Sequence, residues 1–241
     1  MQILNLESGT AFQMGKGKNW RVVHPDMGAT QITLNHGQHA PGQEFTQHLH
    51  DESEDMIVVL EGGGHIRQGD VYTPIIAGDG IFVPAREVHG TVNTTDQPAR
   101  LISFQSPPDM ALYRGERDHP NDAPTPEIGH RSGVQVIPMA KAGPVFGKSG
   151  DWRSVVSPEK GSQHLSLDYV QLNDGEAFTH EPIGAESIYV LIGGGATVQT
   201  NGDTSMLGLR DVIFLKQEDT FSLSQAGSEP TTLLHCWALA K

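Results

Sequence analysis

The chain has 241 residues, and its 16 Lys and Arg residues against 29 Asp and Glu residues give a formal net charge of −13 at pH 7. Both halves are acidic and no basic stripe interrupts them, so the electrostatic footprint of a nucleic-acid or anionic-membrane surface is missing. The length permits one large domain or two modest ones, each with its own core.

A single cysteine, Cys236, excludes an intramolecular disulfide and suits a reducing compartment. Residues 1–7 have neither the basic start nor the apolar stretch of a signal peptide. No apolar run reaches the roughly 18 residues of a membrane span. We therefore expect a cytoplasmic protein that neither spans a membrane nor binds nucleic acid.

Short runs rich in Val and Ile, separated by turns, predict antiparallel strands, and the 28 Gly and 15 Pro residues fit that pattern. In one such region Glu44, Thr46, His48 and His50 occupy alternate positions. Alternation predicts that these four side chains share one face of a strand. Two imidazoles placed in this way can bind the same metal ion.

Further groups of the same kind follow along the chain. Residues 51–55 are rich in carboxylates, and His89 comes after a Pro turn as a third candidate ligand. Ser103 and Gln105 alternate on the last predicted strand of this half and are expected to reach the same pocket. A short helix is expected over residues 109–117.

The first region resembles cupin motif one, G-x5-H-x-H-x(3,4)-E-x6-G, from Gly42 to Gly62, with Asp55 at the position of the motif's Glu. The second region matches cupin motif two, G-x5-P-x-G-x2-H-x3-N, except that Arg86 replaces its second Gly. The motif-two residues are Gly78, Pro84, His89 and Asn93. The sequence therefore resembles the cupin superfamily, which implies a jelly-roll barrel that holds one divalent metal through three histidines and one carboxylate.

The resemblance implies the metal ligands His48, His50, Asp55 and His89. Glu54 is an alternative to Asp55, because the family spacing allows three or four residues between the second histidine and the acidic ligand. We favour Asp55, since the internal repeat aligns it with Glu186. Three imidazoles and a carboxylate suit one divalent transition metal, Fe, Mn, Ni, Co or Zn.

The second half of the chain repeats the first: Trp20 recurs as Trp152, 132 positions later. We therefore predict an all-β protein, a tandem duplication of two antiparallel jelly-roll (cupin) barrels. Its predicted parts are an N-terminal barrel with the metal site in residues 1–110, a Pro-rich linker in residues 111–133 and a degenerate C-terminal barrel in residues 134–241.

The repeat also predicts that the second copy has lost the metal ligands. The alignment matches His48 with Glu181, His50 with Ile183, Asp55 with Glu186 and His89 with Phe221. His180 is one position out of register and is expected to point away from the barrel interior. We expect this barrel to be structural or dimerising, without a metal.

The leading functional hypothesis is a metal-dependent enzyme acting on a small polar oxygenated substrate that chelates the ion, most simply a dioxygenase. One alternative is an isomerase or lyase acting on a sugar or keto acid, with Glu44 or Glu54 as the catalytic proton carrier. A second alternative is a non-catalytic metal- or ligand-binding protein. Paired barrels with exposed sheet edges also suggest a homodimer.

Overall fold

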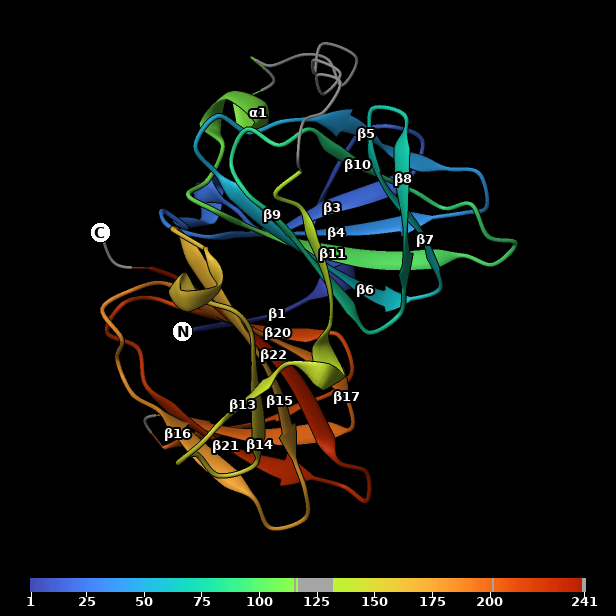
Figure 1. The fold of residues 1–241 in the computed structure, drawn as a ribbon. Helices are drawn as coiled ribbons and strands as arrows, with labels where there is room; N and C mark the ends of the chain where they lie inside the picture. Colours follow the sequence, from blue (N-terminus) through green and yellow to red (C-terminus); the bar gives the residue numbers. More distant parts are fainter. Residues whose placement is uncertain (115, 117–131, 201, 240–241) are drawn as a thin grey trace. The chain divides into compact units, whose positions relative to one another are not determined.

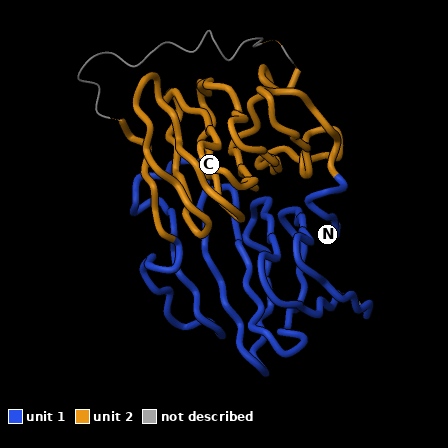
Figure 2. Tube along the Cα trace, turned by 90° about the vertical axis from the view of Figure 1, so that its right-hand side faces the viewer, with its two compact units in different colours: residues 1–8, 139–241 blue, residues 9–138 orange. Residues whose placement is uncertain are grey.

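The computed structural model describes residues 1–114, 116, 132–200 and 202–239, and most of these lie in antiparallel strands (Figure 1). The predicted all-β class is confirmed. The chain divides into two compact units: unit 2 is residues 9–138, and unit 1 is residues 1–8 with 139–241 (Figure 2). Most of the predicted linker falls on residues 115 and 117–131, outside the described residues.

Unit 2 contains two antiparallel sheets, one of seven strands and one of four. The larger follows the order β12 (Gln135–Pro138), β9 (Asp79–Val83), β6 (Glu54–Glu61), β11 (Ala99–Ser106), β4 (Thr33–His39), β3 (Lys18–Val23) and β2 (Thr10–Phe12). The smaller follows the order β5 (Glu44–His48), β10 (His89–Val92), β7 (Gly63–Gln68) and β8 (Val71–Ile76).

Unit 1 repeats this arrangement with its own strands. Its larger sheet follows the order β1 (Gln2–Asn5), β20 (Asp211–Leu215), β17 (Ser187–Gly193), β22 (Thr231–Ala238), β15 (Leu165–Leu172), β14 (Asp151–Val156) and β13 (Gly143–Val145). Its smaller sheet follows the order β16 (Ala177–His180), β21 (Phe221–Ala226), β18 (Gly195–Thr200) and β19 (Asp203–Leu207).

The first strand of each copy completes the sheet of the other copy. Strand β1 pairs with β20, with Ile3 opposite Ile213, and strand β12 pairs with β9, with Val136 opposite Ile81. The predicted boundaries divide the chain at the linker, whereas these pairings assign residues 1–8 to unit 1 and carry unit 2 through Pro138. The backbone groups along one side of β20 and of β9 are thereby hydrogen-bonded by a strand from the other copy of the repeat.

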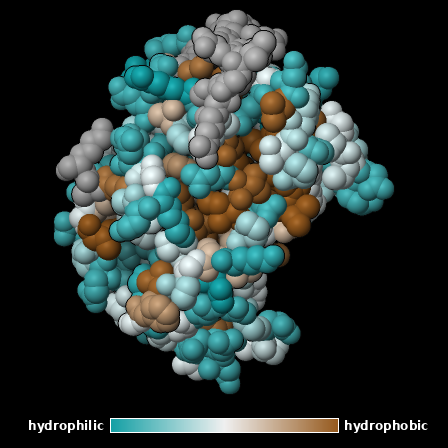
Figure 3. Space-filling model, viewed as in Figure 1, coloured by the Kyte–Doolittle hydropathy of each residue, from teal (hydrophilic) through white to brown (hydrophobic). Residues whose placement is uncertain are grey.

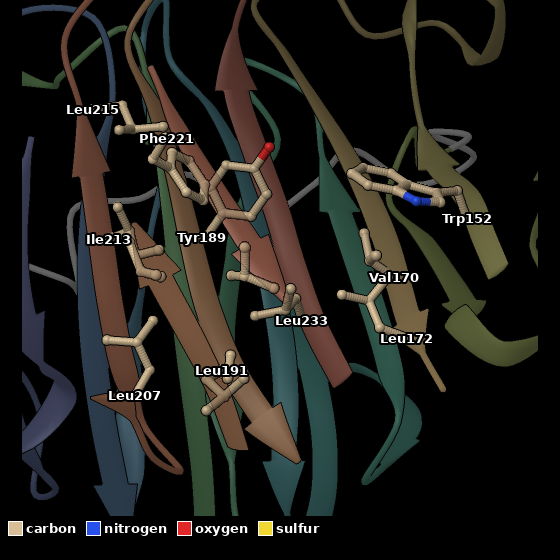
Figure 4. Close-up of a cluster of buried hydrophobic side chains, with 13 residues drawn as sticks. Trp152, Val170, Leu172, Tyr189, Leu191, Leu207, Ile213, Leu215, Phe221 and Leu233 are labelled. Carbon is tan, nitrogen blue, oxygen red and sulfur yellow. The ribbon is translucent and has the colours of Figure 1, made fainter. Parts of the chain in front are cut away.

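The interior of each unit follows the alternation of its strands. On β6, Ile57 and Val59 lie in the apolar core, and Asp55 belongs to the same inward row near the start of the strand. On β17 the corresponding core residues are Tyr189 and Leu191, which lie among the buried apolar side chains of unit 1 (Figure 4). Asp55 thus places a carboxylate in the lining of a pocket in the interior of unit 2.

One α-helix occurs in the described part of the chain, α1 (Met110–Arg114), within the region where a short helix is expected. Among the described residues no helix is long and apolar enough to cross a membrane. Figure 3 shows a hydrophobic area on the displayed face, surrounded by hydrophilic residues. Val71 and Ile76 are exposed on β8, which is the edge strand of the smaller sheet. The homodimer stays a prediction.

Candidate metal centre

Four buried side chains converge in unit 2. His48, His50, Asp55 and His89 each offer one ligand atom, and these atoms all lie within 4.8 Å of one another. His48 and His89 face each other as paired residues of β5 and β10, and Asp55 lies at the start of β6. The two sequence motifs therefore meet in space, although 34 residues separate Asp55 from His89.

A β-bulge in β5 sets which side chains reach this cluster. Thr91 is paired with Phe45, but His89 is paired with His48, so β5 carries one residue more than β10 over this stretch. Phe45 consequently points to the pocket, with its ring centroid 5.4 Å from that of His48. Glu44 lies outside the pocket lining, with a carboxylate oxygen 3.7 Å from Nη1 of Arg67, so it does not share a face with His48.

The structure also separates the two candidate acidic residues. Asp55 belongs to the cluster of four, whereas Glu54 is buried but does not line the pocket. Adjacent strand residues point to opposite faces, so only one of the two carboxylates can face the histidines. Geometry thus favours Asp55 as the acidic group beside them.

The hydrogen bonds of two histidines fix their tautomers. Nδ1 of His48 lies 2.9 Å from the carbonyl oxygen of Thr46, and Nδ1 of His89 lies 2.9 Å from the carbonyl oxygen of Glu87. A carbonyl oxygen only accepts, so each Nδ1 carries a proton, and each Nε2 faces the cluster, that of His89 at 3.3 Å from Asp55 Oδ2. This is the arrangement found in metal-binding histidines, whose second nitrogen donates to a backbone or carboxylate oxygen.

The Asp109 carboxylate orients His50, and an amide and a hydroxyl contact Asp55. Nδ1 of His50 lies 2.9 Å from a carboxylate oxygen of Asp109, which directs Nε2 of His50 toward Asp55 at 3.4 Å. The Gln105 amide donates to Asp55 Oδ1 at 3.2 Å, and the Ser103 hydroxyl donates to Asp55 Oδ2 at 3.3 Å. The expectation that Ser103 and Gln105 reach the pocket is confirmed.

Asp109 was missed at the level of sequence. It lies 59 residues beyond His50, in the segment between β11 and α1, where no strand alternation indicates its direction. A local signal did exist: Oδ1 of Asp109 accepts the backbone N–H of Leu112 at 3.0 Å, a contact typical of an Asp that starts a helical turn.

The electrostatics of the cluster are dominated by burial and by its own charges. Burial lowers the pKa of His48 well below its ordinary value, and the neighbouring His89 and His50 lower it further. Burial alone would also lower the pKa of His50, but Asp55 and Asp109 outweigh it and raise the pKa to about 9. Burial would raise the pKa of Asp55, yet His50 and His89 hold it well below its usual range.

The four side chains lie in the wall of a pocket whose cavity volume is about 90 Å³. Apolar and aromatic residues form much of its lining, among them Phe12, Phe45, Ile57, Leu101 and Leu112. Polar side chains also line it, and several of them contact the ligand cluster directly. Such a pocket suits a small molecule with an apolar body and some oxygen functions.

Arg86, the departure from motif two, does not line this pocket. It is exposed, with a φ of 68°, and its backbone N–H donates to the carbonyl oxygen of His50 at 2.7 Å. The motif's glycine therefore stands at a position that requires the left-handed conformation. Arginine occupies it here at a conformational cost.

Strand pairing corrects the alignment of the second copy. His180 is paired with Phe221 as His48 is paired with His89, so His180 and not Glu181 occupies the His48 position. The reason is the bulge in β5, which β16 lacks. His180 is buried, contrary to expectation, and its Nδ1 lies 3.0 Å from the Tyr189 hydroxyl.

The same pairing changes the partner of Asp55. Asp55 is opposite Val83 and Ser187 is opposite Leu215, so Asp55 corresponds to Ser187, and Glu54 corresponds to Glu186. The alignment of Asp55 with Glu186, from which Asp55 was favoured in the sequence, is therefore wrong by one residue. The geometry of unit 2 nevertheless favours Asp55. Unit 1 has His180, Ser187 and Phe221 where unit 2 has His48, Asp55 and His89.

Comparison with known families and curated proteins yields related sequences. A family model described as "Cupin domain" matches residues 36–104. "Protein SchB" of Streptomyces halstedii is 29% identical over 118 residues, which cover 49% of this chain and 75% of SchB. "Tetracenomycin polyketide synthase protein TcmJ" of Streptomyces glaucescens is 30% identical over 121 residues, which cover 50% of this chain and 72% of TcmJ.

Solved structures resemble the chain over almost its whole length. Protein Ylba of E. coli superposes with a TM-score of 0.77 at 9% identity, covering 98% of this chain and 90% of its own. A variant of oxalate decarboxylase from Bacillus subtilis has a TM-score of 0.71 at 13% identity, covering 98% of this chain and 77% of its own. At these identities the likeness concerns the fold alone.

Proposed function

Since this chain belongs to the cupin superfamily and carries a buried cluster of three histidines and one aspartate, we propose that unit 2 is a metal-dependent catalytic barrel. Its substrate is a small oxygenated molecule that enters the pocket above the cluster. The leading reaction class is a dioxygenase-type oxidation.

One observation carries this proposal: the Nε2 atoms of three histidines, whose Nδ1 atoms bond backbone carbonyls or Asp109, converge with the Asp55 carboxylate on a common volume. The donor set fits a divalent transition ion such as Fe, Mn, Ni, Co or Zn. When bound, such an ion supplies Lewis acidity toward a chelated oxygen and, where it is redox-active, electron exchange with O₂.

The protein's own groups prepare the site. Backbone carbonyls and Asp109 keep the three imidazoles oriented, while Gln105 and Ser103 hold the Asp55 carboxylate from two sides. The aromatic side chains Phe12 and Phe45 add apolar surface to the pocket wall. A fixed donor set in a largely apolar pocket requires little reorganisation during the reaction.

The relatives indicate a class of substrate. TcmJ is named as a tetracenomycin polyketide synthase protein, and a further relative, CurC of Streptomyces cyaneus, as a polyketide synthase. We infer a phenolic or similarly oxygenated polyketide-like substrate, whose apolar body suits the pocket lining. The isomerase or lyase alternative needs a different proton carrier, because neither Glu44 nor Glu54 lines the pocket.

The first test is metal content in protein purified without chelators. We expect about one transition ion per chain in the wild type, and less than about a tenth of that in His48→Ala, because the loss of one of four donors opens the site. His65→Ala is the matched control, since His65 lies outside the cluster and bonds Thr94. Equal metal content in His48→Ala and the wild type would contradict the proposal.

The second test distinguishes the reactions. Oxygen consumption by the Fe(II)-loaded protein with catechol-type substrates supports the dioxygenase. Turnover with Zn or Mn and no oxygen consumption supports the isomerase or lyase class instead. Tight ligand binding without any turnover supports a non-catalytic protein.

A further inference from the structure

We propose that Arg21 forms an anion-binding subsite in the pocket of unit 2, so that the substrate carries a carboxylate or phenolate at the end remote from the metal ligands. This inference rests on the proposed function for the other end of the substrate, which meets the metal. The inference specifies the charge and the length of the substrate that the pocket accepts.

The first step is the placement of the charge. Arg21 is on β3 and lines the pocket, and among the described residues that do so it is the sole lysine or arginine. The rings of Phe12 and Tyr113, which also line the pocket, lie against its guanidinium. A guanidinium in such surroundings attracts an oxyanion more strongly than one in open water does.

The second step is that Arg21 lacks a carboxylate. Its Nη2 donates to the carbonyl oxygen of Tyr113 at 3.2 Å, and no salt bridge links it to an acidic residue of the described chain. Five other described arginines have acidic partners, and a sixth, the exposed Arg86, has a backbone carbonyl; the five are Arg67, Arg100, Arg114, Arg153 and Arg210. A partly buried guanidinium without an anion is unusual and indicates that a ligand supplies one.

The third step is preorganisation. The guanidinium carbon of Arg21 lies 4.2 Å from the ring centroid of Tyr113 and 4.9 Å from that of Phe12. These contacts hold the planar group by its faces. Its five N–H donors lie in its plane, and one of them is used by the Tyr113 carbonyl, so a pair remains for a bidentate oxyanion.

The fourth step gives the distance to the metal ligands. Arg21 is paired with Asn35 on β4, and Asn35 is paired with Ser103 on β11. All three line the pocket, and two strand spacings separate the backbones of Arg21 and Ser103 by roughly 10 Å. Because the Ser103 hydroxyl lies 3.3 Å from Asp55, this row gives the backbone distance between a strand beside the metal ligands and the strand that carries the cation.

The ligand that satisfies these conditions is an aromatic acid about as long as a phenylpropanoate, with an oxygen pair at one end and an anion at the other. Its ring would lie against apolar lining such as Ile57 and Leu101. A neutral molecule of the same shape would leave the Arg21 charge without a partner, which weakens binding.

The test compares two probes of the same shape, 3-(3,4-dihydroxyphenyl)propanoate and its methyl ester, by titration calorimetry with the Zn(II)-loaded protein. We expect the wild type to bind the acid about 10- to 100-fold more tightly than the ester, the range for a hydrogen bond to a charged group. Arg21→Met should remove this preference and leave ester affinity within about 3-fold. Arg21→Lys should retain part of it, because the charge stays and the planar fork is lost.

Arg67→Met is the matched control, because Arg67 also lies over a tyrosine ring, at 5.4 Å from Tyr72, but does not line the pocket. Its preference for the acid should equal that of the wild type. Equal binding of acid and ester by the wild type overturns the subsite, as does an equal loss of both probes in Arg21→Met with metal content intact.

Failure of the metal proposal would look different. A wild type that takes up no metal contradicts the proposed function, while the subsite is still tested by 3-phenylpropanoate against 3-phenylpropanamide, neither of which needs an ion. Preference for the acid that Arg21→Met abolishes supports the subsite in that case too, and equal affinities overturn it.

Discussion

Nδ1 of His50 lies 2.9 Å from a carboxylate oxygen of Asp109, and the other carboxylate oxygen of Asp109 accepts the backbone N–H of Leu112 in α1. Asp109 thus joins a candidate metal ligand to a helix. The same helix carries Tyr113, whose carbonyl oxygen and ring contact Arg21. A continuous series of contacts therefore connects the ligand cluster with the cation in the pocket wall.

Replacement of Asp109 should weaken metal binding without removing a ligand. Asp109→Ala should lower the affinity for Zn(II) about 10- to 100-fold, because the His50 imidazole loses the group that orients it and increases its basicity. Asp109→Asn, which retains an acceptor oxygen but not the charge, should lose less. Competition with a chromophoric chelator measures both affinities.

Asp70→Asn serves as the control for the loss of one negative charge, since Asp70 is exposed in the turn between β7 and β8. Its affinity should match that of the wild type. Wild-type affinity in Asp109→Ala would show that the contact between His50 and Asp109 does not support the metal.

Metal binding should release a proton from His50. With a pKa of about 9, the His50 imidazole is charged at pH 7 and has to become neutral when its Nε2 binds an ion. His48 and Asp55 release none, because the pKa of each is held well below its ordinary value. The affinity should therefore rise about tenfold per pH unit toward pH 9 and level off above it.

Calorimetry in buffers of different ionisation enthalpy counts the released protons directly. About one proton per bound ion is expected at pH 7. No dependence of the heat on the buffer would contradict the assignment. Since Asp109 is one cause of the raised pKa of His50, Asp109→Asn should release fewer protons than the wild type.

The four ligand-type residues were found from sequence because the motifs fix their spacing along two strand ends. Glu44 was misplaced because a single extra residue between Phe45 and His48 reverses the face on which preceding side chains lie. Such a bulge has no marked sequence signal, since neither Thr46 nor Gln47 is a glycine or a proline.

The same bulge explains the wrong equivalent of His48 in the second copy. A constant offset of 132 residues aligns the strand pairs, whereas the sequence match of Phe45 with Phe178 needs an offset of 133. Offsets read from local similarity therefore drift by one residue. Where side chains alternate between interior and exterior, one residue is enough to turn a group inward, as with His180.

Acid should destabilise unit 2 through His39. Burial lowers its pKa to about 4, and neither ring nitrogen has a hydrogen-bond partner in the structure. The unfolded chain binds a proton near pH 6.5 and the folded protein does not, so the contribution of His39 to stability is fully present above about pH 6.5 and is lost as the pH falls toward 4. The loss amounts to about 3 kcal/mol.

The measurement is the free energy of unfolding in urea at pH 7 and pH 4.5, for the wild type and His39→Gln. The wild type should lose more stability over this interval, and the difference between the two proteins reports His39. His65→Gln is the control at a half-buried histidine and should follow the wild type. An identical pH dependence in His39→Gln would show that His39 is not buried in the neutral form.

The turn of motif two offers a change that should stabilise the protein. Arg86 has a φ of 68°, in the region that favours glycine, and its side chain is exposed. Arg86→Gly should raise the free energy of unfolding by about 0.5–1 kcal/mol, because relief of the left-handed strain exceeds the added entropy of the unfolded chain.

Gly78→Ala is the converse change. Gly78 has a φ of +92° and no atom lies within 4 Å of the new methyl group, so the substitution should lower the free energy of unfolding by about 1 kcal/mol through the backbone alone. Urea midpoints measured at constant m-value check both, and a lower midpoint for Arg86→Gly would mean that the arginine side chain contributes more than its backbone strain removes.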